Sequence, residues 1–401
     1  MPARHALVFA AGALAVIAGC ASRPAGGGAT ATVPSSTPFP TTAVAYAIGD
    51  PAGGGEEKIA DVFDPATGTL LGRFATKVPN LKTNVGQIVL GRSGKQLLVT
   101  AYDREDPVRV HSGVYACDLG SPAARYLGSL GSGVPVDATI GSDDVLEVLV
   151  TDPSAATDLA TNRIVSFDLR TGLMESHDNP LPARAAGRPT PIAIVSDAPH
   201  HRLYVTDERG AVSTLQSSTF RYLHTSGGAN ANFTVSGGSI AFDRRHGLLY
   251  QLGILTNVDE HQRPVQLGAL LTTSLATGDS RMISFPYQPA PGAVLNRAGT
   301  QLFFGSLYAR SYGLTRIDLW NSAVRTRGFD SSVYRPEFVN SGKLAFSNDG
   351  ASVLLPVAVP DPNDPERLET GAMLQFDPAT LALRGVVSSP DDFRSGGVVS
   401  N

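Results

Sequence analysis

One short turn sequence recurs along almost the whole chain and constrains its fold more than any other feature. It reads Phe63-Asp64-Pro65-Ala66-Thr67-Gly68, and close copies begin at Phe167 and Phe376. An Asp at the end of an apolar strand accepts hydrogen bonds from backbone N–H groups two residues on, Pro presets φ, and Gly takes positive φ. Each copy therefore predicts a tight hairpin turn, and we interpret its Asp as a structural rather than a catalytic residue.

The spacing of these copies predicts the architecture. Together with weaker copies they are anchored at positions 64, 118, 168, 216, 274, 318 and 377, which are 44 to 59 residues apart. This period is typical of propeller blades with four strands. Hairpins such as residues 88–99 lie between the copies and supply two more strands to each unit. We therefore predict an all-β fold, a seven-bladed β-propeller of four-stranded blades that spans residues 43–401.

The two ends of this region predict how the ring closes. Residues 44–50 correspond to the second strand of a blade, and no first strand comes before them. Residues 395–401 resemble residues 236–240, which open a first strand. We expect the C-terminal strand to complete the N-terminal blade and close the ring, which would remove the open sheet edges of an unclosed fan.

The first 42 residues predict export and anchoring. A basic start at Arg4 and an apolar run over residues 6–18 are typical of an export signal, because the run is too short for an ordinary membrane span. The run ends in Ile17-Ala18-Gly19-Cys20, which resembles the lipobox of bacterial lipoproteins. This resemblance implies a signal peptide over residues 1–20, lipidation of Cys20, and a chain held at the cell membrane outside the cytoplasm. The alternative is a plain signal peptide cleaved nearby.

Residues 21–42 separate this signal from the repeats. They are mainly Ala, Gly, Ser, Thr and Pro with a single charge at Arg23. Such a segment cannot bury enough apolar surface to order itself, so we predict a disordered tether.

The alternation of the two repeated motifs also resembles a known group of proteins. The order of strand, polar turn, strand, loop and Asp turn is similar to the YVTN-type β-propeller repeats, in the wider family that includes WD-like, lactonase and quinoprotein propellers. The best match is His201-Arg202-Leu203-Tyr204-Val205-Thr206-Asp207. The resemblance covers nearly everything after the tether and implies the propeller fold, but propellers carry unrelated functions on one scaffold.

Composition and isolated residues exclude several functions. A net charge of −4 leaves no basic footprint for nucleic acid. The single Trp320 argues against the quinone cofactor of resembling propellers, which stack a Trp at each blade, and we expect no cofactor. Cys117 is interpreted as a small buried residue, since no second cysteine besides Cys20 exists to pair with it. His201 and His246 recur at one turn position, which favours local structure over a metal site, and residues 361–366 form an acidic loop without the spacing of a calcium loop.

Binding in propellers commonly uses the loops that gather at one face of the ring. We therefore interpret the chain as an exported, lipid-anchored binding or interaction module at the cell envelope rather than an enzyme, with an envelope protein or a small ligand as its partner. Arg and Tyr are favoured in binding hot spots. The candidate binding residues in these loops are Arg109, Arg188, Arg263, Arg310, Tyr334 and Arg335.

Two alternatives remain open. The first is a propeller enzyme of lactonase or lyase type with a site at the channel mouth, in which Glu260, His261 and Arg263 would share proton transfer and anion stabilisation. Adjacent residues of an extended loop point in different directions, so a solvated charged loop explains the same three residues. The second alternative is a scaffold of an envelope complex, which would expose a large apolar patch.

Overall fold

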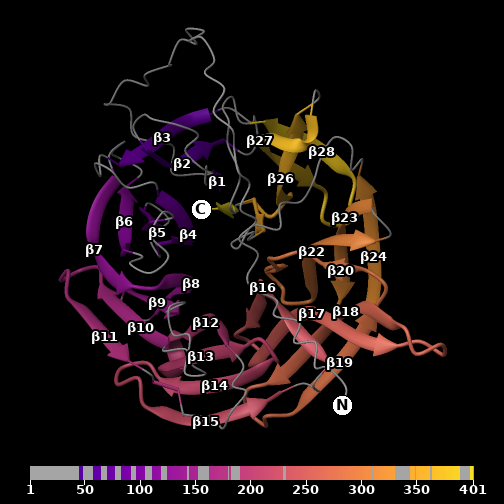
Figure 1. The fold of residues 1–401 in the computed structure, drawn as a ribbon, viewed down its shortest axis with the longest axis horizontal. Helices are drawn as coiled ribbons and strands as arrows, with labels where there is room; N and C mark the ends of the chain where they lie inside the picture. Colours follow the sequence, from indigo (N-terminus) through magenta and orange to yellow (C-terminus); the bar gives the residue numbers. More distant parts are fainter. Residues whose placement is uncertain are drawn as a thin grey trace, which may run out of the picture. The chain divides into compact units, whose positions relative to one another are not determined.

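The computed structural model contains strands almost exclusively. It describes residues 45–47, 57–64, 70–76, 83–91, 96–103, 111–118, 124–141, 144–151, 162–178, 180–181, 190–228, 232–308, 311–329, 344–347, 349–361, 364–388 and 398–400. All of them belong to one compact unit, residues 35–401, whose sheets are arranged around a central channel (Figure 1). The predicted signal peptide, Cys20 and the tether lie outside the described residues.

Each sheet is antiparallel, and in every sheet except the one that contains β29 the strands follow one another in the chain from the channel to the perimeter (Figure 1). The first sheets are β4 (Thr83–Leu90), β5 (Gln96–Asp103), β6 (His111–Asp118) and β7 (Ala124–Ser132), then β8 (Val134–Ile140), β9 (Val145–Thr151), β10 (Asn162–Asp168) and β11 (Met174–Asp178). The next are β12 (Pro191–Asp197), β13 (Arg202–Asp207), β14 (Ala211–Gln216) and β15 (Tyr222–Gly227), with the short 3-10 helix η2 (Ala198–His200) after β12, then β16 (Phe233–Asp243), β17 (Leu248–Val258), β18 (Pro264–Ser274) and β19 (Ser280–Phe285).

The remaining strands complete the unit. They are β20 (Gln288–Pro289), β21 (Val294–Leu295), β22 (Gln301–Tyr308), β23 (Ser311–Asp318) and β24 (Ala323–Phe329), then β25 (Ala345–Phe346), β26 (Val353–Asp361), β27 (Asp364–Phe376) and β28 (Leu383–Ser388). The last sheet combines β29 (Val398–Ser400) with β1 (Ala45–Ala47), β2 (Glu57–Phe63) and β3 (Leu70–Thr76).

These sheets confirm an all-β propeller but correct the predicted blade composition. The prediction of a seven-bladed β-propeller made of four-stranded blades is wrong, because the described residues form six four-stranded blades, not seven, and β20 to β24 form a five-stranded sheet instead. Its innermost strand is split, with Pro289 opposite Ser306 and Val294 opposite Phe303. Pro291 has no N–H to donate to the ladder. Gly292 has a positive φ of 96°. The chain therefore leaves the sheet between the two halves of the strand.

Strand β29 joins the two ends of the unit. It pairs antiparallel with β1, with Ala45 opposite Ser400 and Ala47 opposite Val398. The C-terminal strand thus completes the sheet that the N-terminal strands begin, which confirms the predicted closure. The unpaired edge that β1 would otherwise present is covered.

The recurring Asp turns have the predicted chemistry. Asp168 Oδ1 accepts the backbone N–H groups of Arg170 and Thr171 at 2.9 and 3.2 Å. Asp377 Oδ1 accepts those of Ala379 and Thr380, both at 2.8 Å. These hydrogen bonds, first among the causes, lower the pKa of both carboxyls. The Asp residues are therefore structural, as interpreted.

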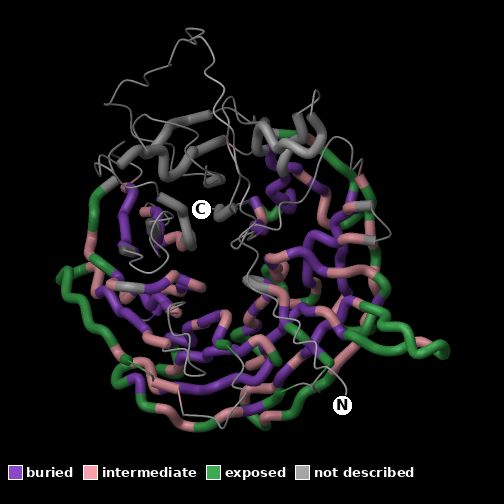
Figure 2. The backbone as a smooth tube through the Cα atoms, in the orientation of Figure 1, coloured by how far each residue is buried: buried purple, intermediate pink, exposed green. Residues whose placement is uncertain are grey.

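The core lies between neighbouring blades. One cluster combines Leu98 and Val114 of the β4–β7 blade with Val148 and Val165 of the β8–β11 blade, and all four side chains are buried. Figure 2 shows this pattern around the unit, with buried strands inside and exposed turns at the perimeter. Each fully buried aliphatic or aromatic side chain contributes roughly 1.5–3 kcal/mol, so the stacking of blades is the main source of stability.

Candidate functional site

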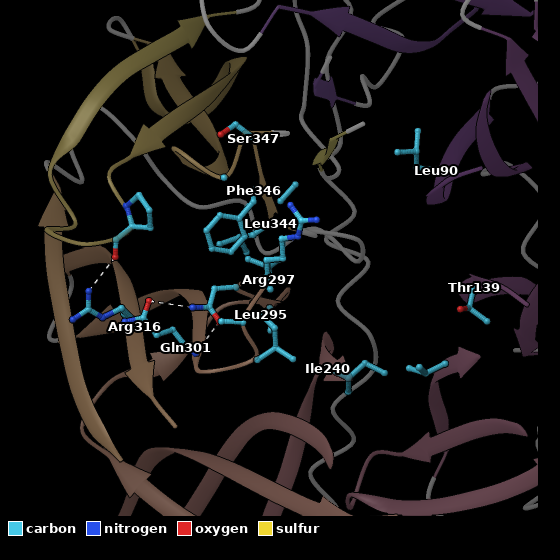
Figure 3. Close-up of a pocket in the computed structure, with 18 of the residues that line it drawn as sticks. Leu90, Thr139, Ile240, Leu295, Arg297, Gln301, Arg316, Leu344, Phe346 and Ser347 are labelled. Atoms are coloured by element: carbon cyan, nitrogen blue, oxygen red, sulfur yellow. Dashed lines mark hydrogen bonds between the residues drawn. The ribbon is translucent and has the colours of Figure 1, made fainter. Parts of the chain in front are cut away.

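A cavity of about 1050 Å³ lies in the central channel. Its walls come from the innermost strands of several blades (Figure 3). The innermost strands contribute mainly through their C-terminal halves, as Leu90 of β4 and Ile240 of β16 illustrate, and β22 contributes its first residue, Gln301. The turns that join innermost to second strands, which we call the inner turns, also line it through residues 296–298, Ser347, Asp349 and Gly350. The cavity therefore lies at the inner-turn end of the channel.

Most of the wall is apolar. The larger apolar side chains that line it are Leu90, Ile194, Ile240, Leu295, Leu344 and Phe346. Figure 3 labels five of them, Leu90, Ile240, Leu295, Leu344 and Phe346, which come from several sheets. A cavity of about this size whose wall is more apolar than polar is compatible with a small-molecule site.

One polar group on the wall links two blades. Asp137 of β8 is buried, and its Oδ2 accepts the backbone N–H of Ile194 in β12 at 2.9 Å. Two residues on, Thr139 Oγ1 accepts the N–H of Ser196 at 3.3 Å. The inner strand bulges beside these contacts, because Pro135 and Asp137 lie opposite the consecutive residues Val150 and Leu149. Bulges re-aim side chains in this way. The polar wall at Asp137 and Thr139 is thus held by the neighbouring blade.

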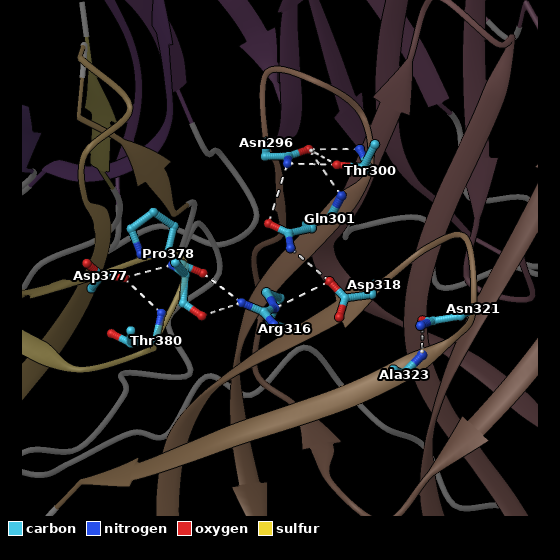
Figure 4. Close-up of polar contacts among 11 residues, drawn as sticks. Asn296, Thr300, Gln301, Arg316, Asp318, Asn321, Ala323, Asp377, Pro378 and Thr380 are labelled. Atoms are coloured by element: carbon cyan, nitrogen blue, oxygen red, sulfur yellow. Dashed lines mark hydrogen bonds and ion pairs between the residues drawn. The ribbon is translucent and has the colours of Figure 1, made fainter.

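A second polar group, Arg316 of β23, bridges two sheets (Figure 4). Its side chain is 6% exposed, and Nη1 donates to the carbonyl oxygens of Pro378 and Ala379 at 3.0 and 2.7 Å. Nε lies 3.4 Å from Asp318 Oδ1, which also accepts Gln301 Nε2 at 2.8 Å. The carbonyls belong to the Asp377 turn of the β25–β28 blade. The Arg316 guanidinium therefore joins two neighbouring sheets of the cavity wall through these contacts.

Arg297 differs from Arg316. It is exposed, lies on the β21–β22 inner turn and lines the cavity. Within the described part of the chain, no hydrogen bond or ion pair engages its guanidinium. In Figure 3 its side chain extends toward Leu344 and Phe346. It is a cation beside an apolar wall.

Two inner turns carry matching pairs of Asp and His. His200 Nδ1 lies 2.8 Å from Asp197 Oδ2, and His246 Nδ1 lies 2.6 Å from Asp243 Oδ2. Both carboxylates are buried and both imidazoles are exposed. The matching residue is thus His200, not the predicted His201, which occupies the left-handed position after η2.

These pairs include a Tyr at the same spacing. Tyr204 and Tyr250 follow the two Asp residues by equal intervals. Burial, and secondarily the charges of Asp197 and Asp243, raise the pKa of each phenol to about 12. Both phenols therefore stay protonated near neutral pH.

The second pair lies next to the cavity. Gly299 belongs to the inner turn whose residues 296–298 line the wall. A Cβ added there would be 2.8 Å from Asp243 Oδ2, and Gly299 has a φ of 71°. The Asp243 carboxylate therefore packs against the turn that forms the cavity rim, although neither Asp243 nor His246 lines the cavity.

The sequence-predicted catalytic candidates lie elsewhere. Glu260, His261 and Arg263 form the exposed tip of the β17–β18 hairpin. Asp259 organises this tip, since its Oδ1 accepts the backbone N–H groups of His261 and Arg263, both at 2.8 Å. None of these residues lines the cavity. The hairpin joins a second to a third strand, so it lies at the opposite end of the blade from the inner turns.

The other predicted binding residues, Arg109, Arg188, Arg310, Tyr334 and Arg335, lie outside the described residues, and their role stays a prediction.

Cys117 is fully buried, as interpreted, and burial raises the pKa of its thiol to about 12. Trp320 is exposed on the β23–β24 turn. In the described ranges, no group of three or more His, Cys, Asp or Glu side chains could hold a metal ion. No helix in those ranges is long and apolar enough to cross a membrane.

Comparisons with known proteins give the fold. No family model and no curated protein sequence matches the chain. Among solved structures, a Bacteroides fragilis protein assigned as a 6-phosphogluconolactonase is 14% identical with a TM-score of 0.56, covering 89% of this chain and 98% of that one. A periplasmic gluconolactonase of Pseudomonas aeruginosa is 17% identical with a TM-score of 0.54, covering 88% and 99%.

A third similar structure has a different activity. A dihydro-heme d1 dehydrogenase is 13% identical with a TM-score of 0.51, covering 90% of this chain and 75% of that one. At such identities the likeness shows the β-propeller fold alone, and function has to be argued from the site.

Proposed function

We propose that this chain is a binding propeller that holds a small organic molecule in the cavity at the inner-turn end of its channel. The observation that carries the proposal is the cavity itself, about 1050 Å³ with a wall that combines apolar side chains and polar groups. Asp137 and Arg316 are both engaged with neighbouring blades, which supports a rigid, preformed site. Preformed sites bind without the entropic cost of ordering their walls.

A neutral fluorescent probe tests this proposal. The apolar dye 1-N-phenylnaphthylamine should bind the protein with a gain in fluorescence. The paired substitutions Leu90→Trp and Ile240→Trp should reduce that gain, because both side chains line the cavity and larger rings would narrow it. A matched control places Trp at Val258, which is exposed on the β17–β18 hairpin. Equal dye binding by wild type and the cavity-filled variant would exclude the cavity as the site.

The propeller enzyme is the second candidate, and the Asp243–His246 pair favours it. A buried carboxylate that holds an exposed imidazole beside a cavity is an arrangement used in general base catalysis. For a lactone, His246 would take a proton from water, the hydroxide would bond to the carbonyl carbon, and the ring C–O bond would break as the proton passes to the leaving oxygen. Two of the similar structures are described as lactonases, which supports testing this substrate class.

Proton release from D-glucono-1,5-lactone separates the two functions. A lactonase would exceed the spontaneous rate, and His246→Gln would reduce its rate by about 100-fold or more. His261→Gln serves as the comparison, since it tests the hairpin site predicted from the sequence. If the wild-type rate equals the spontaneous rate, the lactonase function is refuted and only the binding function remains.

Export and lipid anchoring remain part of the proposal. The lipobox-like sequence ending at Cys20 supports them. Wild-type protein should incorporate an alkyne-tagged fatty acid and sediment with membranes, and Cys20→Ser should do neither. Soluble wild-type protein without the tag would refute the anchor.

A further inference from the structure

The charged side chains on the cavity wall differ in how many contacts they make within the protein. Asp137 accepts the N–H of Ile194. Asp349 Oδ1 accepts Ser347 Oγ at 2.6 Å and the N–H of Ala351 at 2.9 Å. Arg316 donates to two carbonyl groups. Arg297 is the remaining charged side chain of the wall, and within the described chain its guanidinium engages none of these groups.

The neighbouring inner turns add positive charge at the same end of the channel. Arg244 and Arg245 are exposed on the β16–β17 inner turn, and Arg244 Nη2 reaches the carbonyl oxygen of Ser196 in the neighbouring blade at 3.1 Å. The carboxylates of these turns, Asp197 and Asp243, are 6% and 4% exposed and bonded to His side chains. The groups that these turns present to solvent are therefore basic.

The surroundings of Arg297 define the rest of the ligand. Leu295, the last residue of β21, lies two positions before Arg297 in the chain. The Arg297 side chain extends toward Leu344 and Phe346 (Figure 3). A guanidinium beside an apolar wall matches a molecule with an anionic group at one end and an apolar body. Resting on the function proposed above, we propose that the cavity ligand is a small amphiphilic anion, a carboxylate, sulfonate or phosphate on an apolar body, and that Arg297 binds its anionic group.

A pair of dyes that differ in one anionic group tests this assignment. The dye 8-anilinonaphthalene-1-sulfonate carries a sulfonate that 1-N-phenylnaphthylamine lacks. In the full protein, Arg297→Gln should weaken binding of the sulfonate dye about tenfold and change binding of the neutral dye less than about twofold. Arg297 has no partner in the described chain, so the variant should keep the wild-type thermal melt.

Two further variants complete the design. Arg327→Gln removes an exposed Arg on the perimeter strand β24, outside the cavity lining, and should change neither dye. Arg297→Lys keeps the charge but not the two-pronged donor, so it should restore part of the affinity for the sulfonate dye.

The outcomes separate this inference from the proposed function. Selective loss of the sulfonate dye in Arg297→Gln supports the inference. If Arg297→Gln binds both dyes like wild type, while the cavity-filling pair Leu90→Trp and Ile240→Trp still reduces binding of the neutral dye, the anionic class is wrong and the cavity function stands. If the cavity-filling pair reduces binding of neither dye, the proposed function fails and this inference fails with it.

Discussion

Replacement of Arg316 by Met should destabilise the protein more than a typical substitution. The side chain is 6% exposed, and it donates to Pro378 and Ala379 across the boundary between two sheets. Methionine fills a similar volume but leaves both carbonyl groups without their donor and leaves Asp318 without its cation. Removing one partner of a buried charged pair costs about 3–5 kcal/mol, and two lost charge-assisted hydrogen bonds are consistent with that range.

Urea unfolding of the purified protein, followed by tyrosine fluorescence and circular dichroism, measures this loss. The control is Arg327→Met on the same sheet, where an exposed side chain should change stability by less than about 0.5 kcal/mol. The free energy of unfolding lost by the double variant Arg316→Met with Asp318→Asn should be smaller than the sum of the losses of the two single variants. The reason is that the neutral Asn at position 318 leaves no uncompensated charge when Arg316 is absent. A loss below about 1 kcal/mol for Arg316→Met would refute the bridging role, and strict additivity would refute the coupling of Arg316 to Asp318.

Three further predictions concern other parts of the fold. Deletion of residues 398–401 should lower the melting temperature by about 5 °C or more, because β1 loses its partner strand, and an unchanged melt would contradict the closure. Cys117 should resist a thiol reagent at pH 8 in the folded protein and react fully in denaturant, since burial raises its pKa to about 12; fast labelling of the native state would be the contrary result. Asp168 and Asp377 have lower pKa values in the folded protein than in the unfolded chain. They therefore stabilise the fold at pH values above their unfolded pKa of about 3.9, and this contribution is lost as the pH falls through the folded pKa. Melts from pH 7 to pH 2 should show the gap between wild type and Asp168→Asn/Asp377→Asn closing below about pH 4, and a constant gap would contradict the shift.

Local chemistry made much of the fold predictable. The Asp turns at Asp168 and Asp377 depend on residues within the turn itself, so a short sequence suffices to identify them. The pairing of β29 with β1 was predictable because an incomplete first unit and a spare last strand are both visible in the sequence. The uniform blade composition failed where Pro291 and Gly292 divide an inner strand, because the turn spacing carries no information about that strand.

The candidate site was less accessible to sequence reasoning. Residues such as Asp137, Ile240 and Arg297 are far apart in the chain and meet only because each blade directs its inner strand to the channel. One signal was present, since Asp197 and Asp243 each precede a His by three residues and a Tyr by seven. Alignment of the two units on the Asp and Tyr residues would have selected His200 in place of His201.

The pairing of Ala45 with Ser400 also governs the order of assembly. Nearly the whole described chain lies between these two residues, so this contact has one of the greatest sequence separations that the fold permits. The other blades, and the β1–β3 meander, can form from local contacts as the polypeptide emerges, whereas the pairing of β1 with β29 must wait until residues 398–400 become available. During that interval β1 presents an open edge to other chains. Assembly of this protein is therefore most vulnerable to aggregation immediately before its final strand arrives.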